Sequence, residues 1–376
     1  MKKIGIITIH NVINYGAVLQ AYALLRTIRD QFTECRVEII DYMPQYFSEV
    51  KGTFKLVNVK DLKSFLIELE RLILSGKHKK AEVSFRNFIK GDNNLSPLVD
   101  TLDEIGRQYD VIISGSDQVW NQEVTGGSLD YNYYLSFSDD EKVKKIAYAS
   151  SLGDGYQLST FEKEKAIKWW KKYECLSCRE KDGCDYIEKE VGKKCKLVLD
   201  PSLLLSGENW NRYCEKKQLP IKKGEKYLLI YRLANSTVVY DTAKRVADWY
   251  GLKVYEIGTT LRKNKAVDKL IGGASPEEFL WLFSNAEYVV TNSFHGTAFS
   301  VNFNKNFYSV LPSKRTSRIT SLLEKLGLED RIIKNSLHNI SIIDYESVNE
   351  KLEQLRKESK KYLFDSIEFC IGEKLC

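Results

Sequence analysis

The chain has 376 residues, of which 43% are hydrophobic and 29% charged, and its 57 basic and 51 acidic side chains leave a net charge of +6. This length favours two domains over one core, and the average composition excludes low-complexity, collagen-like and disordered chains. Charges of both signs are mixed along the sequence, so we expect no nucleic-acid partner, because such proteins gather basic residues on one face. The modest positive excess suits small anions or an anionic membrane surface instead.

The N-terminus shows no pattern of an export signal. An apolar run over 4–9 follows Met1-Lys2-Lys3 and is too short for the core of a signal peptide. No stretch approaches the ~20 apolar residues that cross a bilayer. We therefore expect a cytoplasmic protein that could contact the inner face of the membrane peripherally.

The first half of the chain alternates strand and helix patterns. A buried strand over 4–9, a helical apolar stripe from Ala17 and a strand over 36–41 predict a β-α-β unit with a parallel sheet. Further strands are predicted over 110–113 and 145–149, and strand and helix patterns alternate on through 176–180 and 196–200. Residues 54–90 are lysine-rich and helical in pattern, which indicates an insertion.

A second alternating set follows Pro201. Strands are predicted over 227–232, 253–257, 288–290 and 307–311, with a helix near 238–250. Ser275, Pro276 and Glu278 have the spacing of an N-cap, an N1 proline and an N3 glutamate, so a helix begins there. A long, charged amphipathic helix starts near Val348.

The expected fold class is α/β, with two Rossmann-like parallel-sheet domains facing a cleft in a GT-B-like arrangement. The predicted domains are 1–205, including the insertion at 54–90, then 206–345, and a final helix over 346–376 that packs back on the first domain. No Gly-x-Gly-x-x-Gly follows the first strand and no Walker A sequence is present, which argues against dinucleotide and P-loop sites.

Ligands of open parallel sheets bind beyond the carboxyl ends of the strands, and two such ends in the first domain are polar. After the first strand, Asn14 and Tyr15 offer polar groups, and Gly16 lets a ligand approach the start of a helix. The alternative is ordinary turn chemistry.

The other polar strand end of the first domain brings together hydroxyls, a carboxylate and an indole. Ser114, Ser116, Asp117 and Trp120 follow the third strand and suit sugar recognition, in which polar groups bind hydroxyls and an aromatic face packs on the ring. The alternative is a helix start capped by Asp117.

In the second domain, cationic and titratable groups follow the strands. Arg232 ends the first strand and has the bidentate geometry that grips a carboxylate or phosphate, unless it is a solvated surface residue. The loop over 291–297 joins His295 to a helix N-terminus that favours anions, although a histidine is often structural. Lys314, Arg315 and Arg318 follow the next strand, where they could add anion contacts or begin a solvated helix.

Four of the eight cysteines lie close together in the sequence, at 175, 178, 184 and 195. Cys175 and Cys178 have the spacing of a metal-binding pair, but no second such pair and no nearby histidine completes a set of four ligands. We expect free thiols and no metal, with zinc or redox use as the alternative.

Seven short segments together resemble the polysaccharide pyruvyl transferase family, in the family's order and over nearly the whole chain. They are GIIT at 5–8, NYGAVLQAYAL at 14–24, ISGSDQVWN at 113–121, YASS at 148–151, SCRE at 177–180, LDPS at 199–202 and SFHG at 293–296.

The resemblance implies a transferase of the GT-B fold with phosphoenolpyruvate as donor and no other cofactor. The acceptor would be a sugar of a cell-envelope polysaccharide or its lipid-linked precursor, and the product a pyruvate ketal. It maps His295 onto the family's general acid/base and Arg232 onto donor binding, beside Ser293, Gly296, Thr297, Lys314 and Arg318. Asp117 would be the acceptor's base, with Asn14, Tyr15, Gly16, Ser114, Ser116 and Trp120 around the sugar.

One departure from the family concerns the residues before His295. Members often carry an arginine within two residues before this histidine, whereas Ser293 and Phe294 stand here. Arg232 or the segment 314–318 must then bind more of the anion. Two other functions stay open: a GT-B glycosyltransferase that uses a nucleotide sugar, and a glycan-binding member without catalysis.

Overall fold

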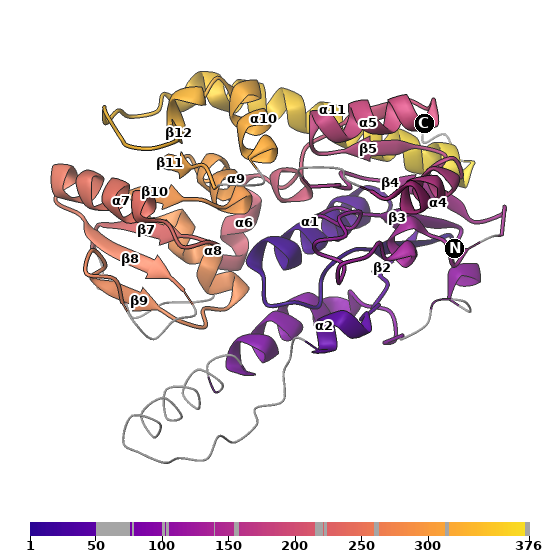
Figure 1. Cartoon of the computed structure of the whole chain (residues 1–376). Helices are drawn as coiled ribbons and strands as arrows, with labels where there is room; N and C mark the ends of the chain where they lie inside the picture. Colours follow the sequence, from indigo (N-terminus) through magenta and orange to yellow (C-terminus); the bar gives the residue numbers. More distant parts are fainter. Residues whose placement is uncertain are drawn as a thin grey trace, which may run out of the picture. The chain divides into compact units, whose positions relative to one another are not determined.

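The computed structural model describes residues 1–49, 76, 79–99, 102, 105–138, 140–153, 158–214, 221, 224–258, 263–312 and 316–372. The chain divides into two compact units (Figure 1). Unit 1 contains Met1–Val50, Ile89–Leu205 and Ser347–Cys376, and unit 2 contains Lys51–Phe88 and Ser206–Glu346. The division after Leu205 coincides with the predicted domain boundary.

Unit 1 is built on a parallel sheet of four strands in the order β2-β1-β3-β4. The strands are β1 (Lys3–Ile7), β2 (Arg36–Ile39), β3 (Val111–Ser114) and β4 (Lys144–Ala147). Two short strands, β5 (Leu176–Cys178) and β6 (Cys195–Leu197), form a parallel pair that continues from β4 through isolated bridges. The chain therefore leaves β1 and β3 toward opposite sides, as in flavodoxin-like sheets.

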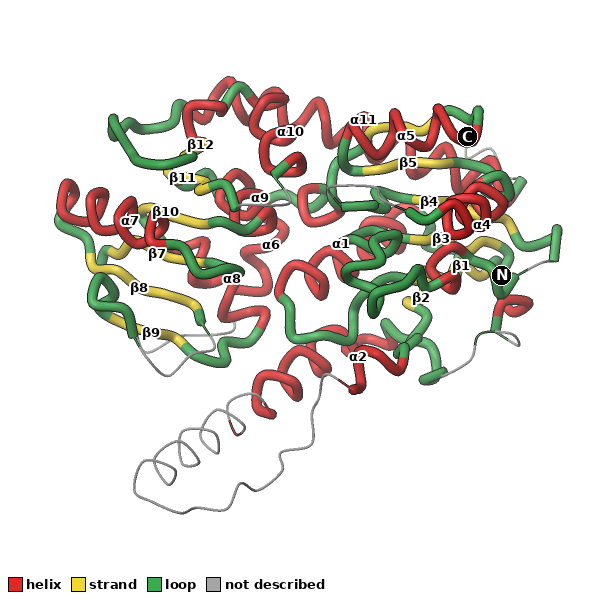
Figure 2. The backbone as a smooth tube through the Cα atoms, viewed as in Figure 1, coloured by secondary structure: helices red, strands yellow, loops and turns green. Residues whose placement is uncertain are grey.

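Helices cover this sheet because their apolar faces need burial (Figure 2). They are α1 (Tyr15–Gln31), α2 (Gln45–Glu49), α4 (Thr160–Trp170), α5 (Lys181–Val191) and, by its larger part, α11 (Tyr345–Ile371). Single 3₁₀ turns occur at Gly91–Asn93, Gly106–Gln108, Tyr131–Tyr134 and Pro201–Leu203. The buried residues of α1 run almost without interruption from Gly16 to Ile28, so this helix lies in the core of the unit.

Unit 2 has a parallel sheet of six strands in the order β12-β11-β10-β7-β8-β9. The strands are β7 (Tyr227–Tyr231), β8 (Lys253–Ile257), β9 (Lys269–Ile271), β10 (Tyr288–Thr291), β11 (Asn306–Val310) and β12 (Ile332–Ile333). Counted from β7, this is the Rossmann order, in which the first and fourth strands are neighbours. The prediction of two Rossmann-like parallel sheets is confirmed.

The helices of unit 2 are α6 (Gly207–Cys214), α7 (Thr237–Tyr250), α8 (Pro276–Asn285), α9 (Phe294–Asn302) and α10 (Ser317–Leu326), with a 3₁₀ turn at Glu329–Arg331. The predicted start of α8 is confirmed in detail. Ser275 caps the helix, Pro276 is its first residue, and Ser275 and Glu278 form a reciprocal capping box.

The last helix, α11, packs on unit 1 over most of its length. The Arg356 side chain donates from Nε to the Leu203 carbonyl at 2.7 Å, and Ser359 Oγ accepts from the Leu199 amide at 2.9 Å. Phe364 makes an edge-to-face contact with Phe32 of unit 1. The C-terminal helix thus contacts the first domain directly, as predicted.

The predicted insertion at 54–90 lies largely outside the described residues, since only Gly76 and 79–90 of it are described, and these are helical. Among the described helices, none combines the length and the apolar character that a membrane span requires.

Candidate functional site

The strand ends of unit 2 meet where the sheet order reverses, between β7 and β10. Thr291 Oγ1 donates to the Tyr231 carbonyl at 2.6 Å, which joins the ends of these two strands. Asn292 then accepts from the Leu233 amide at 2.9 Å and donates to the Ala234 carbonyl at 3.0 Å. Open α/β sheets bind their ligands at such a switch point, so these loops form the candidate site of the unit.

His295 lies in the first turn of α9, directly beyond β10. The predicted loop over 291–297 is wrong in extent: β10 reaches Thr291, α9 begins at Phe294, and only Asn292 and Ser293 connect them. Ser293 is the N-cap, and its Oγ accepts from the Gly296 amide at 3.3 Å. His295 is 7% exposed, and its place in the first turn puts it in the positive field of the helix N-terminus at low dielectric.

Gly296 is required by the tight turn between β10 and α9. A Cβ atom at this position would lie 2.1 Å from Thr291 Oγ1 and 2.9 Å from Thr291 Cβ, both far inside van der Waals contact. Thr291 cannot move away easily, since its hydroxyl binds the Tyr231 carbonyl. The glycine lets the first turn of α9 close over the strand end and thereby places His295.

Arg318 brings a cation to the same turn. It lies in the first turn of α10 and is 8% exposed, and its guanidinium carbon lies 5.8 Å from the centroid of the Phe294 ring. Phe294 directly precedes His295, so this arginine of α10 lies beside one of the two positions where family members often carry an arginine. Lys314 and Arg315 lie outside the described residues.

Arg232 follows β7 and is held by polar neighbours. Its Nε lies 2.7 Å from Tyr240 Oη and 2.7 Å from Glu256 Oε1, and Nη1 donates to Asn235 Oδ1 at 2.6 Å. Glu256 is 2% exposed, so the pair keeps a buried carboxylate neutralised. The alternative of a solvated surface arginine is therefore wrong. Among the described residues none binds Nη2, which leaves one edge of the guanidinium for a ligand.

Thr297 and Ser293 serve the local structure. Thr297 Oγ1 donates to the Ser293 carbonyl and shares a 2.7 Å hydrogen bond with Ser309 Oγ, and its side chain is fully buried. The Thr297 hydroxyl is thus buried and bound internally, and the assignment of Thr297 to donor binding stays a prediction.

In unit 1 the sheet order reverses between β1 and β3, and Asn14 and Tyr15 lie beyond β1. Asn14 is the N-cap of α1, and its Oδ1 accepts from the Ala17 amide at 3.3 Å, which is the turn chemistry left open above. Asn14 is exposed, Tyr15 is half-buried and Gly16 is buried. These residues thus lie at a switch point of the sheet, with Asn14 and Tyr15 accessible.

The polar strand end after β3 is more deeply buried than the sequence suggests. Trp120 is 1% exposed and packs edge-on against Trp170 and Tyr173, with its indole N–H bound to the Tyr133 carbonyl. Ser114 and Ser116 are fully buried, and they donate to the carbonyls of Tyr133 and Ala149. The prediction that Trp120, Ser114 and Ser116 contact the sugar is wrong, because these groups belong to the core.

His10 and Asp41 form a buried pair beyond the ends of β1 and β2 in unit 1. His10 Nδ1 lies 2.9 Å from the Thr8 carbonyl and Nε2 lies 3.0 Å from Asp41 Oδ1, and both His10 and Asp41 are 2% exposed. A carbonyl can only accept, so Nδ1 carries a proton. His10 directly follows the strand predicted over 4–9, but nothing in the sequence indicates its carboxylate partner, Asp41, which follows β2.

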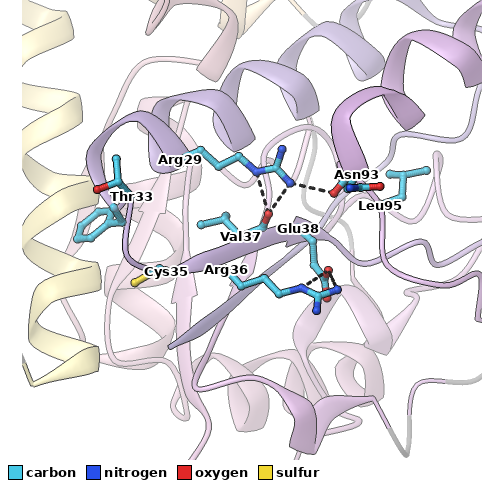
Figure 3. Close-up of a pocket in the computed structure, with 9 residues that line it drawn as sticks. Arg29, Thr33, Cys35, Arg36, Val37, Glu38, Asn93 and Leu95 are labelled. Atoms are coloured by element: carbon cyan, nitrogen blue, oxygen red, sulfur yellow. Dashed lines mark hydrogen bonds and ion pairs between the residues drawn. The ribbon is translucent and has the colours of Figure 1, made fainter. Parts of the chain in front are cut away.

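A separate hollow in unit 1 lies by the amino end of β2, at the edge opposite to the strand ends discussed above (Figure 3). Arg29 donates from Nε and Nη2 to the Val37 carbonyl, and Arg36 pairs with Glu38 at 2.9 Å. Both cations are thus used within the unit. Its position at the amino edge is not where parallel sheets bind ligands.

The family model described as polysaccharide pyruvyl transferase matches residues 14–314, which is most of the chain. The chain belongs to the polysaccharide pyruvyl transferase family. No curated protein matches it in sequence.

Solved structures place this pyruvyl transferase family member among GT-B-like folds. A complex of S. aureus MnaA with UDP aligns with a TM-score of 0.52 at 11% identity, over 100% of this chain and 99% of that chain. A UDP-N-acetylglucosamine 2-epimerase aligns with a TM-score of 0.53 at 10% identity, over 100% of this chain and 97% of that chain. Likeness at this identity concerns the fold alone and confirms the predicted GT-B-like class.

Three of the family-like segments meet at one buried arginine. Arg179, from SCRE, donates from Nη1 to Asp200 Oδ2 of LDPS at 2.6 Å and from Nη2 to Asp117 Oδ1 at 2.8 Å. We refer to these three residues as the Arg179 network. Arg179 is 6% exposed, and the carboxylates of Asp117 and Asp200 raise its pKa further above the usual range despite burial.

The Arg179 network joins three of the family-like segments of this pyruvyl transferase. It ties the loops after β3 and β5 to the turn before Pro201. Asp117 stands at φ 72, and Gly115 at φ 118 would place a Cβ 2.3 Å from the Tyr148 carbonyl oxygen. Asp117 neutralises Arg179 instead of capping a helix, and nothing in the spacing of the two residues along the chain predicts this pair.

Proposed function

We propose that this protein transfers the pyruvyl group of phosphoenolpyruvate to two hydroxyls of a sugar, forming a pyruvate ketal and releasing phosphate. Family membership supports a pyruvyl transferase, and phosphoenolpyruvate as donor is our proposal. The observation that carries it is the first turn of α9 at a Rossmann switch point, where the ring of Phe294 lies beside His295 and the guanidinium of Arg318 packs on that same Phe294 ring. A titratable imidazole and a cation are what an anionic enol donor needs.

The proposed reaction balances with one acid and no metal. His295 gives a proton to the methylene carbon of the enol, which becomes the methyl group, and a cation-like centre forms at the neighbouring carbon. One sugar hydroxyl attacks this carbon, the bond to the phosphate oxygen breaks, and the second hydroxyl closes the ketal. Of the two hydroxyl protons, one replaces the proton given by His295 and the other leaves with phosphate.

We assign donor binding to unit 2. Arg318 lies against Phe294 and can meet the carboxylate or phosphate of the donor beside His295. Nη2 of Arg232 adds a second contact, although Glu256 already balances that charge and weakens its pull on an anion. Gly296 admits the donor to the helix N-terminus, and Lys314 stays a further proposed anion contact.

We assign acceptor recognition to unit 1, at Asn14, Tyr15 and Gly16. The sugar would belong to a cell-envelope polysaccharide or to its lipid-linked precursor, which calls for action at the cytoplasmic face of the membrane. Because Asp117 neutralises Arg179, we now assign it to holding the strand-end loops in place. We therefore expect the base for the sugar hydroxyl among other residues that follow β1, near Asn14 and Tyr15.

Nucleotide-sugar transfer is the competing function, since one fold neighbour was solved with UDP. Isothermal titration calorimetry on the full chain separates the two. Our proposal predicts heat from phosphoenolpyruvate binding that is lost in Arg318→Gln. Tight binding of UDP or GDP without binding of phosphoenolpyruvate would favour the nucleotide-sugar function instead.

His295→Gln tests the proposed acid. We expect turnover of phosphoenolpyruvate to fall by roughly 10² to 10⁴, the usual worth of general acid–base catalysis, while donor binding persists. His338→Gln is the matched control, because His338 is exposed in unit 2 and far along the chain from the switch-point loops. Full turnover in His295→Gln would refute this mechanism.

A further inference from the structure

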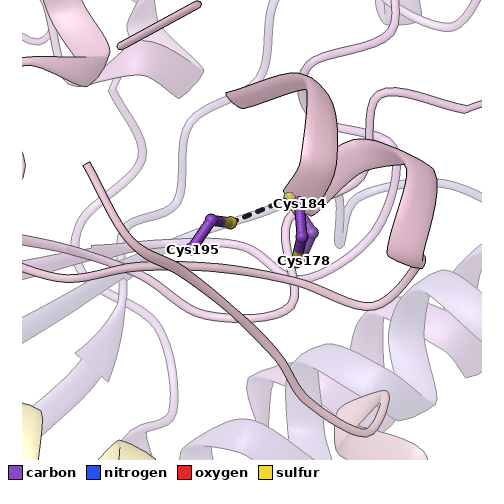
Figure 4. Close-up of side chains that lie close together, drawn as sticks. All are labelled: Cys178, Cys184 and Cys195. Atoms are coloured by element: carbon purple, nitrogen blue, oxygen red, sulfur yellow. Dashed lines mark hydrogen bonds between the residues drawn. The ribbon is translucent and has the colours of Figure 1, made fainter. Parts of the chain in front are cut away.

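Three buried cysteines of unit 1 converge on one point. Cys178 ends β5, Cys184 lies in the first turns of α5, and Cys195 begins β6. Their Sγ atoms all lie within 4.8 Å of one another, and Cys178 Sγ and Cys195 Sγ are 3.8 Å apart (Figure 4). We refer to these three residues as the thiol cluster. The three side chains are 0%, 4% and 7% exposed, respectively.

The thiol cluster differs from the pair that the sequence suggested. Cys175 and Cys178 are three residues apart at a strand, so their side chains point to opposite faces and cannot share a ligand. The fold instead joins Cys178 to two cysteines from α5 and β6, the second of which is 17 residues away along the chain. A spacing rule for metal-binding pairs misses such a set.

The separations within the thiol cluster match those of metal-bound thiolates. With a metal–sulfur distance of about 2.3 Å and a tetrahedral angle, two sulfurs around one zinc ion stand about 3.8 Å apart. This is the separation of Cys178 Sγ and Cys195 Sγ. The third sulfur, that of Cys184, lies within 4.8 Å of both.

We propose that Cys178, Cys184 and Cys195 form a binding site for a soft, thiophilic metal ion, with Zn²⁺ and Cu⁺ as the candidates. Soft thiolate ligands select these ions over Mg²⁺, Ca²⁺ and Mn²⁺. Three thiolates can complete the coordination of Cu⁺, whereas Zn²⁺ would take a fourth ligand from a small molecule or water. The site is separate from the switch-point loops of unit 2 and independent of the proposed function.

The ion would hold together the two-stranded sheet of β5 and β6, the smallest sheet among the described residues. β5 and β6 have three residues each, and two such strands are too short to be stable alone. A metal that joins β5, α5 and β6 adds its binding free energy to the folding of this unit. Arg179 follows Cys178 directly, so the ion would also fix the position of the Arg179 network.

Metal titration of the full chain tests the site. The protein is purified under reducing conditions, stripped with a chelator and titrated with Zn²⁺ or Cu⁺, with Co²⁺ as the spectroscopic probe of thiolate ligation. We expect one ion per chain by native mass spectrometry, thiolate-to-cobalt charge-transfer bands, and a higher melting temperature with metal, because the ion binds the folded state. The ion that gives the tighter complex identifies the metal.

Variants locate the ion. Cys184→Ser should weaken binding by more than the roughly 10- to 100-fold that loss of an outer partner causes, because it removes a ligand. Cys35→Ser and Cys214→Ser, at cysteines outside the thiol cluster, should leave binding unchanged. Circular dichroism of each metal-free variant checks its fold.

Two results would overturn the proposal, and neither needs a folded variant. One is wild-type protein with three reduced cluster thiols that takes up no ion and shows no cobalt–thiolate bands. The other is a disulfide between two cluster cysteines in protein isolated without reductant or metal, which would assign the cluster to redox chemistry.

Discussion

Gly296 shows how a single residue positions the proposed acid. Gly296→Ala forces a methyl group against Thr291, and overpacking of this kind costs about 1–3 kcal/mol. We expect a loss of stability in that range in urea unfolding, with lower turnover because α9 must shift. Gly91→Ala is the control, because a Cβ there meets no atom within 4 Å. Equal stability of the two variants would show that the turn has more room than the contacts indicate.

Substitution of Arg179 tests whether this buried cation stabilises the fold by neutralising the carboxylates of Asp117 and Asp200. Arg179→Met leaves Asp117 and Asp200 buried without their cation, and breaking such a pair costs about 3–5 kcal/mol. Lys2→Met removes a partner of Asp110 from a pair whose side chains are 43% and 37% exposed, and it should cost less than about 1 kcal/mol. The comparison is made by chemical denaturation. A loss below about 1 kcal/mol in Arg179→Met would contradict a structural role for the network.

The position of a residue in the fold could be predicted from the sequence where the residue directly follows a strand with a clear pattern. His295 and Arg232 were found because their strands have strong apolar patterns and a parallel sheet collects its carboxyl ends at one edge. Trp120, Ser114 and Ser116 were misassigned, because polar composition does not reveal burial. Trp120 is covered by Trp170 and Tyr173, which come from a helix and a turn about fifty residues further along the chain.

At the scale of elements, α8 offers the sharpest test. Ser275→Ala removes the N-cap and half of the capping box, and such a loss typically costs about 1 kcal/mol. Ser284→Ala, near the other end of the same helix, should change stability by less than about 0.5 kcal/mol. Thermal unfolding of both variants makes the comparison. Equal melting temperatures would mean that packing against the sheet, and not the cap, sets the stability of α8.

Elements were predictable from the sequence in proportion to their length and the strength of their pattern. The strand at 253–257 matches β8 at both ends, and the start of α8 follows from three residues. β9 and β12 were not predicted, because strands of three and two residues carry no periodicity. The thiol cluster was not predicted either, because its three cysteines meet only when α5 connects β5 to β6 and the two strands pair in parallel.

At the scale of the whole molecule, the alternation of strands and helices was enough to predict two parallel α/β units. The order of the strands could not be predicted from the sequence, because it depends on whether each connection adds the next strand at one edge of the sheet or at the other. That order places the switch point of unit 2 between β7 and β10, where Arg232, Asn292 and His295 follow the ends of neighbouring strands. The long α11 links the end of unit 2 to the core of unit 1.

Mass spectrometry of the acceptor tests the proposed pyruvyl transfer from phosphoenolpyruvate to a sugar most directly. The full chain is incubated with phosphoenolpyruvate and a panel of lipid-linked and model glycosides. We predict an acceptor that gains one pyruvylidene group, with one phosphate released for each, and a gain that is slower by roughly 10² to 10⁴ with His295→Gln. Phosphate release without acceptor modification, or transfer of a sugar from a nucleotide donor to the same panel, would contradict it.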